Sequence, residues 1–259
     1  MAPKTRTYDP AKIRTAVLAQ FGLVADAVRG LEEERLAQPA HLGEWTVRDL
    51  AAHLAWAVGS LAGAAARPSA GRVEVTVATW PFATEPIAGK IAEAHRGQDA
   101  EPLGVLYERT GARLAELLDV LPGDRVLPLW IGGMTVADFL VTRTVELVVH
   151  TDDLNRAAGL EIPFDRQALA ACTRVLADAL AVKAPGASVE VRVPPFAVVQ
   201  CVEGPRHTRG TPPNVVETDP LTWIRLATGR TGWAESLSGA RVRASGERAD
   251  LSALLPVMS

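Results

Sequence analysis

Glu146 and His150 lie four residues apart in a segment whose apolar residues recur at helical spacing. Side chains four apart project from the same face of a helix. Phe139, seven residues before Glu146, and Leu154, four after His150, belong to that face as well, so the carboxylate and the imidazole are expected to point into a helical core. An unpartnered buried carboxylate is strongly unfavourable, and Glu146 is therefore expected to have a partner.

His53 is a candidate partner, because it lies between Leu50 and Ala57 on the inward side of a second predicted helix. A His from one helix and a Glu and a His from another form a three-ligand set of nitrogen and oxygen donors. Three protein ligands with an open position are typical of a catalytic divalent metal, most often zinc. Spacing alone leaves two alternatives open: a locally hydrogen-bonded or solvated Glu–His pair, and a core histidine bonded through its ring nitrogens.

Other side chains near these positions have two interpretations each. Arg143, three residues before Glu146, either holds a carboxylate or orients Glu146, or is a solvated helix arginine. Asp49, four before His53, suits either a carboxylate behind a metal ligand or a helix cap. The remaining candidates, which either support the site or face water or pack as core, are Asp152, Asp153 and Trp45.

Four amphipathic helices are predicted to position these residues. Thr46 and Thr135 each begin a Thr-x-x-Asp sequence that resembles a capping box. The predicted helices follow Asp9-Pro10 up to Gly30, begin at Thr46, run from about Leu103 to Pro122, and run from Thr135 to Gly159, with a short strand possible over 73–77. Amphipathic helices with connections of unequal length favour a four-helix bundle.

The pattern changes after Gly159. One more helix, capped by Asp165, precedes a segment in which Val189, Val191 and Val193 alternate with polar residues, as in a half-buried strand. Further predicted elements are a strand over 196–202, a helix from Asp219 to Gly229, a strand over 241–245 and a helix after Asp250. The predicted fold class is α+β, with a helical bundle over residues 1–160 and a smaller α+β domain over 161–259.

Length and composition exclude several classes of protein. The 259 residues leave room for two domains, and a formal net charge of −3 provides no positive field for nucleic acid or an anionic membrane. Two cysteines, Cys172 and Cys201, cannot form a disulfide framework or an all-cysteine zinc site. No signal peptide or 18-residue apolar stretch is visible. We expect a cytoplasmic monomer or homodimer without nucleic-acid or membrane partners.

Two segments resemble the signatures of the mycothiol-dependent maleylpyruvate isomerase family, which belongs to the wider DinB-like four-helix bundles. They are GEWTVRDLAAHLAW (43–56) and TRTVELVVHTDDL (142–154), and the resemblance extends over about residues 10–158. In that family a Trp precedes a Thr-capped helix that carries the first metal-binding His, and the second signature has Glu and His four apart. The resemblance implies that His53, Glu146 and His150 bind zinc or another divalent metal.

A third segment, GTPPNVVETDPLTWIRLATGR (210–230), resembles the sterol-carrier-like C-terminal domain that accompanies this bundle in many actinobacterial proteins. The resemblance implies a sterol-carrier-like fold, which by itself establishes no lipid ligand. It also implies that an arginine of this domain, Arg225 or Arg230, binds an acidic substrate or the thiol.

The family resemblance implies an enzyme whose nucleophile is an external thiol, mycothiol, as a cosubstrate. This fits the lack of a recognisable activated cysteine. The thiolate would attack an electrophilic carbon of a small substrate, and two outcomes stay open: isomerisation if the thiol leaves after bond rotation, and S-transfer if it stays. The alternative is a non-catalytic sterol-carrier-like protein that binds an apolar small molecule. A zinc-binding regulator of the anti-sigma type is disfavoured, because the usual cysteine motif is missing.

Overall fold

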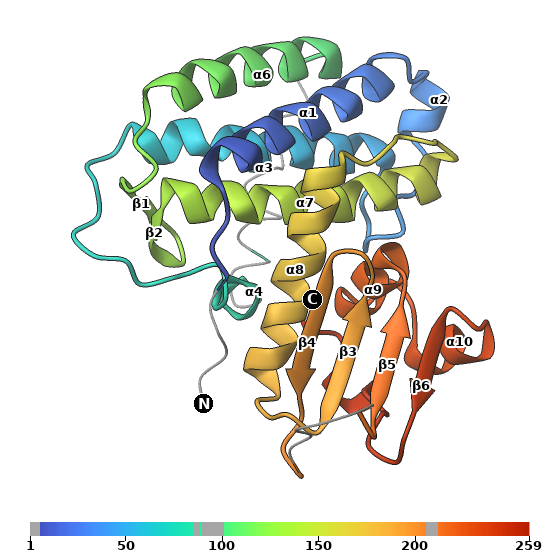
Figure 1. Cartoon of the computed structure of the whole chain (residues 1–259). Helices are drawn as coiled ribbons and strands as arrows, with labels where there is room; N and C mark the ends of the chain where they lie inside the picture. The colour runs from blue at the N-terminus through green and yellow to red at the C-terminus, as the bar shows by residue number, and fades with distance from the viewer. Residues whose placement is uncertain (1–5, 85–88, 90–100, 206–211, 259) are drawn as a thin grey trace. The chain divides into compact units, whose positions relative to one another are not determined.

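The computed structural model describes residues 6–84, 89, 101–205 and 212–258 (Figure 1). The chain forms two compact units, one made from residues 8–76 and 86–169 and the other from 1–7, 77–85 and 170–259. Helices dominate the first unit and a sheet with helices the second, which confirms the predicted α+β class. The domain boundary at residue 160 stays a prediction.

Four long helices make up the first unit. They are α1 (Pro10–Arg29), α3 (Val47–Ala65), α6 (Leu103–Val120) and α7 (Val136–Ala158). Both α1 and α3 pack against α6 and α7, so the four helices enclose a common core (Figure 1). The predicted bundle is confirmed, and the helix between α1 and α3, α2 (Glu33–Leu36), is a single turn.

Side chains at the helix ends satisfy backbone groups that have no partner inside the helix. The Asp9 carboxylate accepts hydrogen bonds from the amides of Ala11 and Lys12 at the start of α1. Thr46 and Asp49 form a reciprocal capping box at the start of α3. Thr135 accepts from the Asp138 amide at the start of α7, and Gly159 ends that helix with φ of 59°. These helix starts are the predicted ones.

The bundle core is apolar with a few hydrogen bonds across it. Tyr107 on α6 donates to the carbonyl oxygen of Ala51 on α3 at 2.8 Å. Gln20 on α1 donates to Thr151 Oγ1 on α7 at 3.1 Å. Apolar side chains that are fully buried in the core include Val17, Val24, Leu50, Leu54, Val58, Leu140, Leu147 and Leu154. Packing therefore fixes the face that each of α3 and α7 turns toward the core.

A hairpin between α6 and α7 is a feature that the sequence did not indicate. It pairs β1 (Val126–Leu129) with β2 (Gly132–Thr135). The strand predicted over 73–77 is wrong: this segment crosses the hairpin without forming a ladder, because the amides of Glu74 and Val75 both donate to the same carbonyl, that of Gly133, at 2.8 and 3.0 Å.

The second unit contains a four-stranded sheet with the order β4–β3–β5–β6 (Figure 1). Its strands are β3 (Val189–Val193), β4 (Ala197–Cys201), β5 (Val215–Thr218) and β6 (Val242–Ser245), and its helices are α4 (Trp80–Ala83), most of α8 (Arg166–Lys183), α9 (Pro220–Ala227) and α10 (Trp233–Ser238). β3 pairs antiparallel with β4 and parallel with β5, and β6 is antiparallel to β5. The helix predicted after Asp250 is a three-residue 3₁₀ turn, Ser252–Leu254.

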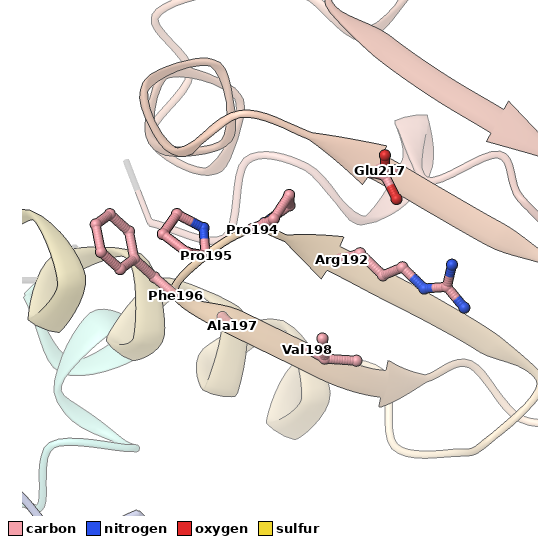
Figure 2. A pocket seen from close by; sticks show the side chains of 7 residues that line it. All are labelled: Arg192, Pro194, Pro195, Phe196, Ala197, Val198 and Glu217. Atoms are coloured by element: carbon pink, nitrogen blue, oxygen red, sulfur yellow. The ribbon is translucent and has the colours of Figure 1, made fainter.

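The sheet has one buried and one exposed face, as the alternating valines of β3 predict. A pocket of about 290 Å³ lies on the exposed face, where the turn between β3 and β4 meets β5 (Figure 2). Phe196 and two prolines line one side of it, and Arg192 and Glu217, which are opposite each other in the ladder, line the other. In the described ranges no helix has the length and hydropathy that crossing a bilayer requires.

Candidate metal centre

His53 on α3 and Glu146 and His150 on α7 come together within the bundle. Glu146 Oε2 lies 3.4 Å from His53 Nε2 and 3.5 Å from His150 Nε2. One ligand atom from each of the three residues lies within 4.8 Å of the others. His53 is 6% exposed, and the side chains of Glu146 and His150 are 14% exposed, so the cluster is nearly removed from water.

The three residues fit a divalent metal ion. Bonds of about 2.0–2.1 Å to nitrogen and oxygen place the ligand atoms of a tetrahedral zinc about 3.4 Å apart. The two separations from Glu146 Oε2 are close to this value, and all three ligand atoms lie within 4.8 Å of one another. The residue types are those of catalytic zinc sites, in which a fourth position stays open for a ligand.

Asp153 determines which nitrogen of His150 faces the cluster. Its carboxylate Oδ2 lies 2.9 Å from His150 Nδ1 and is almost fully buried. Because an ionised carboxylate only accepts hydrogen bonds, His150 Nδ1 donates to Asp153, and Nε2 is the nitrogen that faces Glu146. Without a cation Nε2 shares a proton with Glu146, and a metal that replaces this proton is met by the Nε2 lone pair. This is the usual arrangement behind a metal-binding imidazole. Burial by itself lowers the pKa of His150, but the bonds with Asp153 and Glu146 raise it above its ordinary value.

Arg143 is a buried arginine that links α7 to α3. Its guanidinium donates to the carbonyl oxygen of Ala57 at 2.9 Å and to Thr142 Oγ1 at 3.0 Å, and it stacks over the Phe139 ring at 4.5 Å. Its Nη2 also lies 3.9 Å from Glu146 Oε1. The two oxygens of Glu146 therefore differ: Oε1 faces the arginine, and Oε2 faces the histidines. With 8% exposure, Arg143 is not a solvated helix arginine.

The electrostatics favour a neutral His53 beside an ionised Glu146. Burial lowers the pKa of His53 by more than its hydrogen bond with Glu146 raises it. Burial raises the pKa of Glu146, but its bonds with the two histidines and the charge of Arg143 outweigh this effect and hold the pKa well below its usual range. A neutral imidazole and an ionised carboxylate are the forms that bind metals.

The other residues predicted from the sequence lie in different surroundings. The ring of Trp45 lies 5.0 Å from that of His53. Asp49 accepts hydrogen bonds from the amide and the hydroxyl of Thr46, both at 2.7 Å, as part of the capping box. Asp152 is buried. Arg225 lies on α9 and Arg230 follows it, both in the second unit, and their roles in binding stay predictions.

Two tryptophans beside the cluster were missed in the sequence. The ring of Trp56 lies 6.1 Å from His53 and 6.1 Å from Trp130. Trp56 follows His53 by three residues, which places the two on neighbouring faces of α3 and could have revealed it. Trp130 occupies the turn of a hairpin that was not predicted, and nothing in its spacing relates it to His53.

The fold and the cluster together define the class of this protein: a four-helix bundle that buries a candidate metal centre. The family model described as the mycothiol maleylpyruvate isomerase N-terminal domain matches residues 17–155, more than half of the chain. The chain belongs to this family and is an enzyme of its isomerase class. A second model, described as a bacterial SCP ortholog, matches residues 165–257. Both resemblances found in the sequence are confirmed.

Solved structures support the same fold over nearly the whole chain. Crystal structures of the mycothiol-dependent maleylpyruvate isomerase and of a mutant of it superpose with TM-scores of 0.60. They are 16% and 15% identical to this chain and cover 92% of it, with 93% of their own length matched. A search of the curated proteins gave no match.

Proposed function

We propose that this chain is a zinc-dependent enzyme that uses mycothiol to isomerise a small electrophilic substrate. His53, Glu146 and His150 hold the metal. When bound there, zinc supplies a positive charge and an open position that lower the pKa of a coordinated thiol. The thiolate adds to a conjugated carbon–carbon double bond, the resulting single bond rotates, and departure of the thiolate restores the double bond. The thiol is released unchanged, so atoms and electrons balance.

The observation that carries the proposal is the pair of separations of 3.4 and 3.5 Å from Glu146 Oε2 to two imidazole nitrogens. An ordinary core histidine requires no carboxylate shared with a second histidine. Arg143 lies beside Glu146 Oε1, but Oε2 faces only the two imidazoles, and burying an ionised oxygen there is expensive unless a cation or a proton compensates. A divalent ion satisfies all three groups at once.

The residues of this chain have separate tasks in the proposal. Asp153 keeps the His150 Nε2 lone pair directed at the metal position by accepting from Nδ1. Arg143 faces Glu146 Oε1 and so favours binding through Oε2 alone, which leaves more room for the thiol. Neither Cys172 nor Cys201 is placed to serve as the nucleophile, because both are buried in the second unit.

The competing interpretation is a non-catalytic protein that binds an apolar molecule in the second unit. The pocket on the exposed sheet face is a poor site for such a ligand. Arg192 and Glu217 form one side of its lining, and an apolar molecule bound there would remove their charged groups from water. Arg192, which lines it, forms an ion pair with Glu190 at 2.6 Å and adds charge to the lining.

Metal analysis combined with a thiol-dependent assay tests the proposal. We expect about one equivalent of zinc in the purified protein, and loss of zinc from the His53→Ala and Glu146→Ala variants. Turnover of a panel of conjugated electrophiles is expected to require both zinc and mycothiol. Because isomerisation returns the thiol, substoichiometric mycothiol should support many turnovers, whereas S-transfer consumes one thiol for each product.

His41→Asn is the matched control. His41 is an exposed histidine with φ of 58°, a conformation that asparagine tolerates. This variant should keep zinc and activity. Equal and negligible zinc in the native protein and in both ligand variants, or turnover that is independent of mycothiol, would overturn the proposal. Stoichiometric loss of the thiol would replace isomerisation by S-transfer.

A further inference from the structure

A row of tryptophans leads from the metal centre to the protein surface. Between ring centroids, Trp45 lies 5.0 Å and Trp56 lies 6.1 Å from His53, and Trp130 lies 6.1 Å from Trp56. Trp45 and Trp56 are half-buried, and Trp130 is 54% exposed. The chain has only six tryptophans, and three of them lie in this row.

Trp130 occupies a position where its side chain gains little from folding. With Ile131 it forms the two-residue turn between β1 and β2. Such turns favour glycine, asparagine and aspartate. A large apolar ring in this turn that stays more than half exposed contradicts both turn chemistry and burial, and residues that break local rules without a structural gain are commonly functional.

The hairpin that carries Trp130 is firmly held. Glu74 Oε2 accepts from the Gly133 amide at 3.0 Å, and the amides of Glu74 and Val75 donate to the Gly133 carbonyl. A Cβ at position 133 would collide with the carbonyl oxygen of Arg72, so this close approach requires glycine. Trp130 therefore has a defined position next to Trp56, as a binding surface requires.

We propose that Trp56 and Trp130 form a wall that binds the flat, conjugated part of the electrophilic substrate and so determines the enzyme's specificity. The inference rests on the proposed function and extends it by naming the residues that bind the conjugated group of the substrate. Indole rings present wide apolar faces, and a planar conjugated group stacks on them. A saturated chain of equal length cannot make this contact.

The chemistry of the wall favours the electrophile over the thiol. Mycothiol is rich in hydroxyl groups, and polar groups that leave water require hydrogen-bond partners. An indole offers a single N–H donor and otherwise carbon. A conjugated electrophile has few polar groups to desolvate along its flat face. The wall also begins at His53, so an electrophile on it would lie close to a thiolate at the open metal position.

A titration with two matched ligands tests the wall without turnover. Tryptophan fluorescence of the zinc-loaded protein is followed on addition of trans,trans-2,4-hexadienoate, which is flat and conjugated, or hexanoate, which is saturated. We expect the flat ligand to bind about two- to tenfold more tightly, as one stacking contact implies. The preference should disappear in Trp130→Ala and be largely kept in Trp130→Phe. Val120→Ala, an exposed apolar change on α6, is the control.

Steady-state kinetics then separate the wall from the proposed function. In Trp130→Ala we expect a higher KM for a conjugated electrophile, an unchanged KM for mycothiol and unchanged zinc content. If the native protein has no thiol-dependent turnover, the proposed function fails while the titration still decides the wall. No preference for the flat ligand in the native protein, or a preference that survives in Trp130→Ala, overturns the wall. An effect on the KM of mycothiol instead of that of the electrophile overturns it as well.

Discussion

A single hydrogen bond between Asp153 and His150 prepares His150 for its proposed role as a metal ligand. The bond from Nδ1 to Asp153 fixes both the tautomer and the ring orientation of His150. We predict that Asp153→Ala lowers zinc affinity by about 10- to 100-fold although all three ligands are retained. Asp153→Asn should lose less, because its amide oxygen still accepts from Nδ1. Competition with a chromophoric chelator at fixed pH measures both affinities, and equal affinities in Asp153→Ala and the native protein would contradict the role of Asp153.

Arg143 contributes to stability as well as to the orientation of Glu146. Replacing it by methionine removes its hydrogen bonds to Ala57 and Thr142 and leaves the buried Glu146 Oε1 without the cation beside it, whereas the Ala57 carbonyl still accepts from Ser60 Oγ. We predict that Arg143→Met lowers the free energy of unfolding by about 1–3 kcal/mol, the usual cost of an unsatisfied buried polar group. Urea unfolding of zinc-free protein measures this loss. Arg143→Lys keeps the charge but not the planar guanidinium, so its free energy of unfolding should lie between those of the native protein and Arg143→Met. An unchanged unfolding midpoint in Arg143→Met would refute the contribution of Arg143 to stability.

We predict that Cys172 and Cys201 are unreactive thiols in the folded protein and take no part in turnover. Burial raises the pKa of Cys201 to about 11, and only about one thiol in a thousand is ionised at pH 8. Folded protein should therefore react very slowly with an aromatic disulfide reagent, and urea-unfolded protein should react at once. The double variant Cys172→Ala, Cys201→Ala should retain mycothiol-dependent turnover. Loss of turnover in folded, zinc-loaded double variant would show that an internal thiol takes part.

At the scale of single residues, the proposed ligand set could be predicted from the sequence, and helical geometry supplied two of its three members. Glu146 and His150 share a helix face by spacing alone. His53 required the further assumption that two helix faces meet, and the family signatures supplied it. The double role of Arg143 and the donor role of His150 Nδ1 depend on distances between helices, which no spacing contains. The position of Trp130 beside Trp56 could not be predicted for the same reason.

The β1–β2 hairpin carries Trp130 of the proposed tryptophan wall, and Glu74 is one of the side chains that anchor this hairpin. We predict that Glu74→Ala increases hydrogen exchange at the Gly133 amide, which donates to Glu74 Oε2 at 3.0 Å. Glu74→Gln retains an acceptor and should exchange at nearly the native rate. The same measurement on α3 amides is an internal control, because the bonds of Glu74 with Gly133 and Arg72 do not involve that helix. Unchanged exchange at Gly133 in Glu74→Ala would show that Glu74 does not hold the hairpin in place.

The contribution of Glu74 also depends on pH. The bond from the Gly133 amide and the bond and charge of Arg72 lower the pKa of Glu74. A carboxylate with a lowered pKa stabilises the folded state fully above its unfolded pKa and loses this contribution as pH falls through the folded pKa. Acid should therefore loosen the hairpin in the native protein. The exchange rate at Gly133, corrected for intrinsic pH dependence, should rise in acid in the native protein and not in Glu74→Ala.

Among the elements, those with side-chain caps were predicted with nearly correct ends. Asp9, Thr46, Thr135, Asp165 and Asp219 each begin a helix as expected, because these caps act locally. The elements missed are short or break local rules. β1 and β2 contain Pro128 and Gly133, which disfavour strands, and β5 is stabilised by its two neighbours in the sheet rather than by its own pattern. The alternating residues at 73–77 predict a strand, but in the structure the amides of Glu74 and Val75 both donate to the carbonyl oxygen of Gly133.

At the scale of the whole molecule, the two units have different relations to the chemistry. The three proposed metal ligands, Asp153, Arg143 and the proposed tryptophan wall all belong to the bundle unit. The second unit contributes Arg225 and Arg230 as predicted binding residues. The family model covers the bundle and the second model covers residues 165–257, so each unit has relatives of its own.

Because the ligands bridge only α3 and α7, zinc should stabilise the bundle unit selectively. A ligand that binds only the folded state at a hundredfold excess over its Kd adds about 2.7 kcal/mol to the free energy of unfolding. We predict that zinc added to metal-free protein slows hydrogen exchange in α3 and α7, while amides of β3 and β5 exchange at unchanged rates. The Glu146→Ala variant should show no slowing in either unit. Slower exchange in the strands without any in α3 and α7 would place the metal outside the bundle, whereas equal slowing in both would mean that the two units unfold as one cooperative body.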